Sequence, residues 1–488
     1  MLFVSAPSLF AERNLRCVKI AQAAAVWAAL VFSGVTYGAS DLVDLRPPPQ
    51  AGGFRQVRVV VEVEGKLKLN SDGKDVQHLP LKVAAELNYI ERVFAQSRQW
   101  TDVRLIRSYQ SAQAKLKLRD AEMTSALRPE RRLIVVESNA KSAQLFSPEG
   151  PLTREELDLV DTTASGLALE SLLPPRIVKI GSTWQLSDHT VARLLGLEAV
   201  NKQDCVATLD SAKDNLAVIS LTGKVAGAAG GVSSEVELKG KLNFDLKQRA
   251  VTWLTLACRE NRDIGHAQPG FETLTTFRLV SAPVRPAAEL SDKALAGLPL
   301  ASTSSTTLLD LTSESARYQL VHDRRWEVIF ERPDATILRL VDHGDLIGQC
   351  NLSPLPPLGK GEQLSLEGFQ DDVKRALGKN LEQVVSGGEE AENGIRILRV
   401  VVAGKTGDLP IQWTYYHLSD DHGRRAALVF TIESNLVERY PQIDRELIDG
   451  FRFLDEKQPT PALNAQPAGG NTAPQSAEKL SAPKALDR

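Results

Sequence analysis

The chain has 488 residues, which is too long for a single hydrophobic core, so two domains with tails are expected. Its shares of hydrophobic (43%) and charged (24%) residues are ordinary for globular protein. The net charge is −3 and the lysines and arginines are scattered, which leaves no basic patch for a phosphate backbone, so nucleic acid is not expected as a partner.

The N-terminal segment has the layout of a secretory signal. Basic residues precede an apolar run at 20–35, and small residues follow it up to Ala39. The run is short for a hydrocarbon layer about 30 Å thick, so we predict a signal peptide over 1–39 and no stable membrane span after cleavage. Tyr37 is a poor residue next to the cleavage site, which leaves an uncleaved N-terminal anchor as the alternative. The protein is expected to be exported, either periplasmic or extracellular.

Residues 40–53 are rich in Pro and Gly and are expected to be a disordered leading segment. Apolar side chains then occupy odd positions from Val57 to Leu69 and again from Leu79 to Leu87, with charged residues at most of the even positions between Val57 and Leu69. This period of two is typical of strands that bury one face. A turn sequence around Gly73 lies between the two runs, so a long antiparallel hairpin is expected.

Shorter signals follow up to residue 282. Strands are expected at 102–109, 131–137, 176–180, 203–210, 215–224, 233–247, 250–261 and 271–281, and helices at 152–160 and 188–196. The first helix is predicted to be capped by Thr153 with Glu156. Residues 54–282 are therefore predicted to be a β-rich domain, a curved antiparallel meander with few helices.

The second half is expected to be an antiparallel sheet flanked by helices. Strands are predicted at 317–323, 326–332, 336–342, 346–353, 394–403, 409–418 and 424–433, the first two paired as a hairpin, with a helix from Leu366 capped by Ser365 and a last helix at 436–449. Residues 283–316 are predicted to be a linker, 317–455 an α/β/α domain, and 456–488 a disordered tail. The fold class is thus predicted to be α+β with two domains.

This order of elements, with Trp326 in an opening strand pair and a last helix that ends on the segment from Ile448 to Phe453, resembles the PsbP-like and DcrB-like domains of exported proteins. The resemblance covers about 140 of the 488 residues and implies a non-enzymatic interaction domain outside the cytoplasm. The segment from Val178 to Trp184 looks like exported β-rich proteins of unknown function. The long one-sided strands are similar, by analogy, to the curved sheet of lipoprotein carriers such as LolA.

Three cysteines remain after the predicted signal. An oxidising compartment would allow a disulfide between Cys205 and Cys258, which both lie in strand-like segments of one domain. The alternative is that these two and Cys350 are small buried thiols.

Motifs of the common enzyme classes are absent from the sequence, so no catalytic, cofactor-binding or metal-ligating residue is predicted. The nearest approach to a site is His417 with Asp420 and His422, because imidazole and carboxylate groups bind divalent metals or act as bases. A solvated hairpin tip explains the same residues, since Asp-Asp-His-Gly is good turn chemistry.

The pattern favours a non-catalytic exported protein that binds an apolar ligand or a protein partner on its curved sheet. An unfamiliar hydrolase or metal-dependent enzyme is the first alternative, and a structural component of the cell envelope is the second.

Overall fold

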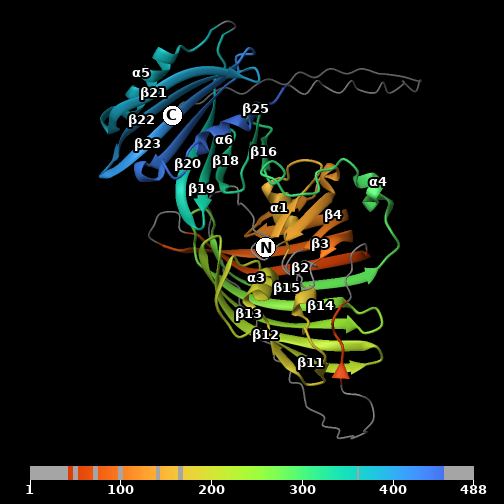
Figure 1. The fold of residues 1–488 in the computed structure, drawn as a ribbon. Coiled ribbons are helices and arrows are strands. Elements are labelled where there is room, and N and C mark those ends of the chain that lie inside the picture. Colours follow the sequence, from red (N-terminus) through yellow and green to blue (C-terminus); the bar gives the residue numbers. More distant parts are fainter. Residues whose placement is uncertain are drawn as a thin grey trace, which may run out of the picture. The chain divides into compact units, whose positions relative to one another are not determined.

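The computed structural model describes residues 42–47, 53–69, 75–96, 103–138, 143–162, 169–359 and 362–455. Its sheets are antiparallel and its helices are few and short, which confirms the predicted fold class (Figure 1). The predicted signal peptide and the predicted tail lie outside these residues. In the part of the chain that is described, no helix is long and apolar enough to cross a membrane.

The largest sheet has 13 strands and is formed by residues 54–283. In spatial order its strands are β7 (Ala143–Phe146), β6 (Leu133–Ser138), β4 (Val103–Leu118), β3 (Gln77–Gln96), β2 (Phe54–Leu69), β15 (Gly270–Pro283), β14 (Ala250–Arg262), β13 (Val232–Asp245), β12 (Leu216–Ala229), β11 (Val206–Lys213) and β9 (Thr183–Gln185). β5 (Ala121–Ala126) pairs with β4, and β10 (Ala199–Gln203) pairs with β12. The run from β11 to β15 is the meander that the sequence predicts.

The alternation of side chains in β2 and β3 explains how this sheet divides apolar from polar residues. Val57 lies opposite Tyr89 and Leu67 lies opposite Leu79, so residues of odd number share one face. These apolar residues are buried, while many of their even-numbered neighbours are exposed. We call the face of the 13-stranded sheet that carries the odd-numbered residues of β2 the inner face.

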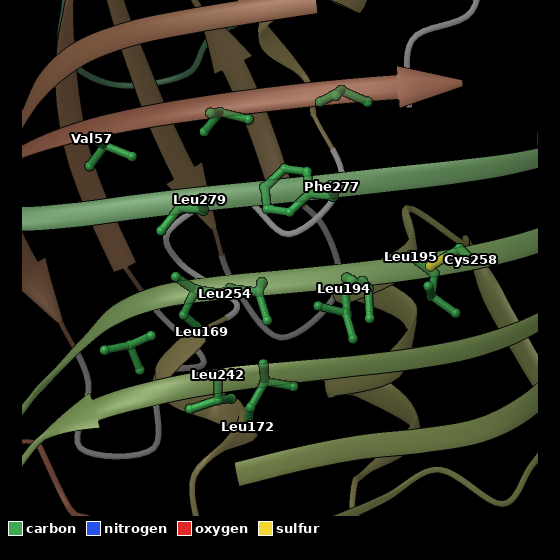
Figure 2. Close-up of a cluster of buried hydrophobic side chains, with 14 of the residues drawn as sticks. Val57, Leu169, Leu172, Leu194, Leu195, Leu242, Leu254, Cys258, Phe277 and Leu279 are labelled. Atoms are coloured by element: carbon green, nitrogen blue, oxygen red, sulfur yellow. The ribbon is translucent and has the colours of Figure 1, made fainter. Parts of the chain in front are cut away.

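Short helical segments and the chain around them bury much of the inner face. They are α1 (Arg154–Val160), η2 (Glu170–Leu172) and α3 (Asp188–Leu195), which together we call the cover. Leu172 of η2 and Leu194 of α3 belong to the same buried cluster as Leu254 and Phe277 of the sheet (Figure 2). Burial of this cluster is the main apolar contribution to the stability of the first half.

The cap that the sequence predicts for α1 is present, and α3 has a cap as well. The Thr153 hydroxyl accepts a hydrogen bond from the Glu156 backbone N–H, and the Glu156 carboxylate accepts one from the Thr153 N–H, which completes the predicted capping box. Ser187 caps α3 in the same way by accepting from the Thr190 N–H. α3 ends at Gly196, whose φ of 66° is one that glycine adopts without strain.

Among the described residues, the segment after β15 packs on part of the opposite face of the sheet. η3 (Ala288–Leu290) and α4 (Asp292–Leu295) pack on Ile106, Val135 and Phe146 of the strands at one end. These two helical elements lie in the segment predicted to be a linker, which also contains β16 (Leu309–Ser313).

The second sheet has seven strands. In spatial order they are β18 (Trp326–Arg332), β19 (Ala335–Asp342), β20 (Asp345–Leu355), β24 (Arg425–Glu433), β23 (Leu409–Asp420), β22 (Ile395–Thr406) and β21 (Leu381–Glu392). α5 (Leu366–Leu377) packs on one face through Phe369 and Val373, and α6 (Ile443–Asp449) packs on the other through Leu447 and Ile448.

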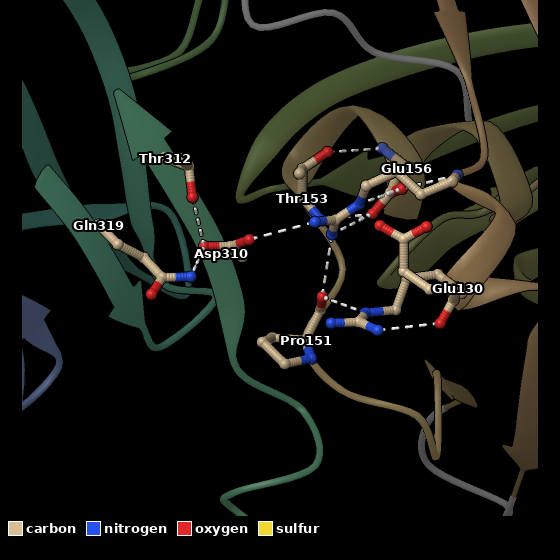
Figure 3. A network of polar contacts seen from close by, with 9 residues as sticks. Glu130, Pro151, Thr153, Glu156, Asp310, Thr312 and Gln319 are labelled. Atoms are coloured by element: carbon tan, nitrogen blue, oxygen red, sulfur yellow. Dashed lines mark hydrogen bonds and ion pairs between the residues drawn. The ribbon is translucent and has the colours of Figure 1, made fainter. Parts of the chain in front are cut away.

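Smaller sheets complete the fold. β16 pairs with β17 (Tyr318–His322), which pairs with β25 (Phe451–Phe453), and β1 (Leu42–Val43) pairs with β8 (Val178–Lys179). Three short 3-10 helices are η1 (Pro129–Arg131), η4 (Gly378–Asn380) and η5 (Ser434–Leu436). Arg128 joins α1 to β16, because its guanidinium donates to both Glu156 and Asp310 (Figure 3).

Two local expectations for the second half are wrong, and one strand has no counterpart in the sequence prediction. β17 and β18 do not form a hairpin, because they belong to different sheets. The last helix begins only at Ile443, since Pro441 and the left-handed backbone of Gln442 (φ 67°) interrupt it. Strand β21 is present although the sequence pattern does not predict it, and almost all of its residues are exposed.

Candidate functional site

Three charged side chains form a row across the inner face. Arg55 of β2 lies opposite Glu91 of β3, and Glu91 lies opposite Arg107 of β4. The exposed fractions are 8% for Arg55, 6% for Glu91 and 0% for Arg107. Charged groups are rarely buried so deeply unless they are paired, so this polar row is an unusual feature of an otherwise apolar face.

Arg55, at one end of the row, is well bonded. Its Nε donates to the Ser281 hydroxyl at 2.8 Å, and its Nη2 donates to the Val251 carbonyl at 2.5 Å. These bonds fix the guanidinium against β15 and β14, so Arg55 is held in place by the sheet itself.

Arg107, at the other end, is poorly bonded. Its Nε lies 3.5 Å from Oε2 of Glu91, which is an ion-pair distance, but no hydrogen bond forms between them. Among the described residues, Arg107 Nε, Arg107 Nη2 and Glu91 Oε2 have no hydrogen-bond partner. A buried polar group without a partner costs roughly 1–3 kcal/mol, and a charged one costs more, so this end of the row requires an explanation.

Two tyrosines stand beside Arg107 on the inner face. Tyr89 and Tyr109 are opposite each other, with ring centroids 4.9 Å apart, and the Arg107 guanidinium carbon lies 4.8 Å from the centre of the Tyr89 ring. Burial raises the pKa of both phenols, although the positive charge of Arg107 opposes the rise. Both hydroxyls therefore stay protonated, and that of Tyr109 has no hydrogen-bond partner in the described chain.

The cover contributes one more charged group to this region. Burial raises the pKa of Glu170 in η2 to about 7, with Arg55 opposing the rise and Glu91 adding to it. The charges of Arg55 and Glu91 in the polar row thus influence the pKa of the Glu170 carboxyl group.

A third buried arginine on the inner face has a full set of hydrogen bonds on the side that faces its carboxylate. Nε and Nη2 of Arg262 both donate to Oε1 of Glu260, at 3.1 and 2.7 Å, and the Ser234 hydroxyl donates to the same oxygen. Arg262 is 3% exposed. The sheet can therefore satisfy a buried arginine with its own residues, and it does not do so at Arg107.

Apolar side chains surround the polar row on the inner face. Val57, two residues from Arg55, and Leu105, two residues from Arg107, are buried on the same face and offer hydrocarbon contacts. The free donors of Arg107 and Tyr109 are of the kind that bind carboxylate or phosphate oxygens.

The residues of the predicted candidate site lie around the end of β23. His417 is 2% exposed, its ring lies 5.8 Å from that of Phe369 of α5, and neither ring nitrogen has a partner in the described chain. Burial, with the nearby Arg425 and Arg396, lowers the pKa of His417 to about 4. His422 is exposed in the turn, where its backbone N–H donates to Asp420, and Asp420 also accepts from Arg424. The described residues contain no cluster of three His, Cys, Asp or Glu suited to a metal ion.

Cys205, Cys258 and Cys350 are buried and carry free thiols in the structure. Cys258 lies opposite Leu238, and Leu238 lies opposite Gly223, whose neighbour across the sheet is Cys205. Burial raises the pKa of Cys205 to about 11 and that of Cys258 to about 12, so neither thiol is activated for chemistry.

The second sheet contains a pocket of about 450 Å³ beside β21 and α6. At its wall, Arg399 and the Tyr416 hydroxyl both donate to Oδ2 of Asp444, each at 2.8 Å. Arg445 is paired with Glu390 in the same wall. These charged groups satisfy one another, so the pocket offers a ligand fewer free donors than the polar row does.

The sequence pattern contains a signal for the polar row. Arg55 and Glu91 stand at odd positions, in phase with the buried valines and leucines of β2 and β3, and Arg107 is in phase with Leu105 and Tyr109. A charged residue on the apolar phase of a strand marks a buried charge. The pattern does not predict the strand register that places these three side chains next to one another.

Comparison with known proteins identifies no family. No family model matches the chain, and no curated protein matches it. Solved structures give distant likenesses: the Ran-binding protein Mog1p of Saccharomyces cerevisiae (8% identity, 30% of this chain, 96% of that chain, TM-score 0.24) and cyanobacterial PsbP of Synechocystis (10%, 33%, 98%, 0.24). MucB in complex with MucA(peri) is 12% identical over 83% of this chain and 94% of that chain, with a TM-score of 0.16. Such TM-scores are too low to establish a shared fold.

Proposed function

We propose that this chain is an exported, non-catalytic binding protein that holds an apolar ligand between the inner face of the 13-stranded sheet and its cover. Export is proposed from the signal-like N-terminal sequence. The observation that carries the binding role is the incompletely paired polar row, buried where the cover meets a large apolar face. A face that served only as a core would be expected to bond its buried charges fully.

The construction of the cover supports this proposal. Its helical segments have seven, three and eight residues, whereas the strands beneath them have up to 20. Helices this short are not stable alone and depend on tertiary packing, while a long ladder of strand hydrogen bonds keeps its own shape. We therefore expect the cover to move away from the sheet when a ligand enters, while the sheet keeps its shape.

Hydrogen bonds tie the cover to the sheet: Gln203 of β10 donates to Asp188 of α3, and Trp184 donates to η2. Trp184 Nε1 in β9 donates to the Leu172 carbonyl of η2 at 2.9 Å. Replacement of this tryptophan by phenylalanine keeps an aromatic ring and removes the donor, which destabilises the closed cover by about 1 kcal/mol.

We expect the purified full chain to bind the apolar fluorophore N-phenyl-1-naphthylamine saturably. The Trp184→Phe variant should bind it more tightly. The affinity should rise by about fivefold if the lost hydrogen bond is worth about 1 kcal/mol. The control is Trp253→Phe in β14, which also removes a tryptophan but leaves η2 untouched; its affinity should match that of the wild type. No saturable binding, together with no apolar molecule in an organic extract of the purified protein, would falsify the proposal.

We further propose that the second half, with helices on both faces of its sheet, is a PsbP-like interaction module. The support is the order of its elements, with α5 and α6 on opposite faces.

A further inference from the structure

We propose that Arg107 receives the anionic head group of an amphiphilic ligand, whose hydrocarbon chain lies between the cover and the inner face. This inference rests on the proposed function and adds the chemical class of the ligand: a long hydrocarbon chain that ends in one carboxylate or a similar anion.

The first step is to identify the Arg107 donor atoms that have no hydrogen-bond acceptor. Nε and Nη2 form one edge of a guanidinium group, and this protein uses that edge to bind carboxylates elsewhere. Arg262 presents Nε and Nη2 to Glu260, and Arg128 presents the same two atoms to the two oxygens of Glu156 at 2.7 Å each. On Arg107 the same edge is buried and has no hydrogen-bond partner in the described chain.

The second step is the number of donors. The Tyr109 hydroxyl, two residues along β4 on the same face, also lacks a partner among the described residues. Arg107 offers its free guanidinium edge, and the Tyr109 hydroxyl lies beside it. An anion with two or more acceptor oxygens satisfies them in a way that a neutral apolar molecule cannot.

The test compares dodecanoate with dodecanol by isothermal titration calorimetry on the full chain, below micellar concentrations. We expect dodecanoate to bind at least about tenfold more tightly than dodecanol, which corresponds to about 1.4 kcal/mol. Arg107→Gln should abolish this preference while both compounds still bind. Arg262→Gln, which alters an equally buried but fully bonded arginine on the same face, should keep the preference.

Two more conservative variants keep the proposal testable if Arg107→Gln does not fold. Tyr109→Phe removes one donor and keeps the ring, and it should lower the preference by about threefold if one hydrogen bond is lost. Arg107→Lys keeps the charge without the two-pronged edge and should retain part of the preference. Circular dichroism spectra check that each variant is folded.

The outcomes separate the two proposals. If both compounds bind with equal affinity, or if the preference survives in both Arg107 variants, the role of Arg107 is wrong and the apolar site stands. If neither compound binds, both proposals fail. If acetate competes as well as dodecanoate, the site takes only a small anion and the assignment of an amphiphile is overturned.

Discussion

Glu170 illustrates how one residue can make the stability of the cover depend on pH. Its carboxyl group is buried in the cover, and this burial raises its pKa from 4.5 to about 7. Between these two pH values the unfolded chain loses the proton of Glu170 and the folded chain keeps it. Folding stability from this group is therefore complete below pH 4.5 and declines as the pH rises to 7.

We expect Glu170→Gln to remove this decline, because glutamine remains neutral at every pH. The variant should gain stability relative to the wild type as the pH rises from 4.5 to 7, with a constant difference above that. Urea unfolding at half-unit pH steps measures the difference. Glu130→Gln, an exposed change in η1, should show no such trend; a flat difference for Glu170→Gln would contradict the buried, proton-retaining carboxyl.

Side chains that are close in the sequence around the end of β23 lie in different surroundings in the structure. His417 and His422 are five positions apart, yet one is buried beneath α5 and the other is exposed in the turn. Tyr415 and Tyr416 pack on opposite faces of the second sheet, Tyr415 towards α5 and Tyr416 towards α6. Alternation along a strand predicts the second separation, whereas the first depends on where the strand ends.

Among the elements, α5 has clear local determinants and β21 has almost none. The Ser365 hydroxyl accepts a hydrogen bond from the Gly368 backbone N–H at 3.1 Å, and Phe369 and Val373 give α5 one apolar side. β21 is an edge strand whose side chains are mostly exposed, so it lacks the alternation that marks a half-buried strand. Only its pairing with β22 makes it a strand.

The cap of α5 gives a quantitative prediction at this scale. Ser365→Ala leaves one N-terminal backbone donor without its partner and should lower the free energy of unfolding by about 1 kcal/mol. Urea unfolding followed by circular dichroism measures the change. Ser386→Ala on the exposed edge strand β21 is the matched control and should stay within about 0.5 kcal/mol of the wild type, and an equal effect of both changes would argue against the cap.

In the molecule as a whole, arginines connect the two halves of the described chain. Arg154 of α1 donates to the Arg324 carbonyl, Arg324 donates to the Leu145 carbonyl, and Arg128 bonds to two carboxylates. Arg128 bonds to Glu156 of α1 and to Asp310 of β16, and both carboxylates are buried. Thr312 and Gln319 donate to the other oxygen of Asp310, which extends the network into the three-stranded sheet (Figure 3). A backbone bridge between Leu152 and Leu309 runs beside it.

We expect Arg128→Gln to weaken this connection, because it leaves two buried carboxylates without their cation. The cost should be about 2 kcal/mol, below the 3–5 typical of a fully buried pair, since both carboxylates keep other donors. Differential scanning calorimetry should then show the single transition broaden or divide in two. Arg132→Gln, at an exposed neighbouring position, should leave the profile unchanged, and an unchanged profile for Arg128→Gln as well would show that the network does not couple the halves.

The sequence alone determined which residues of the long strands face inward, where α1, α3 and α5 begin, and that antiparallel sheets dominate. These properties depend on neighbours within a few positions, through the period of two and the chemistry of helix caps. Only the tertiary structure decided that Arg55, Glu91 and Arg107 form one row, that η2 brings Glu170 to it, and that β17 and β18 part into different sheets. These arrangements depend on the register of strands far apart in the chain and on the segments that cover the sheet, neither of which a local pattern records.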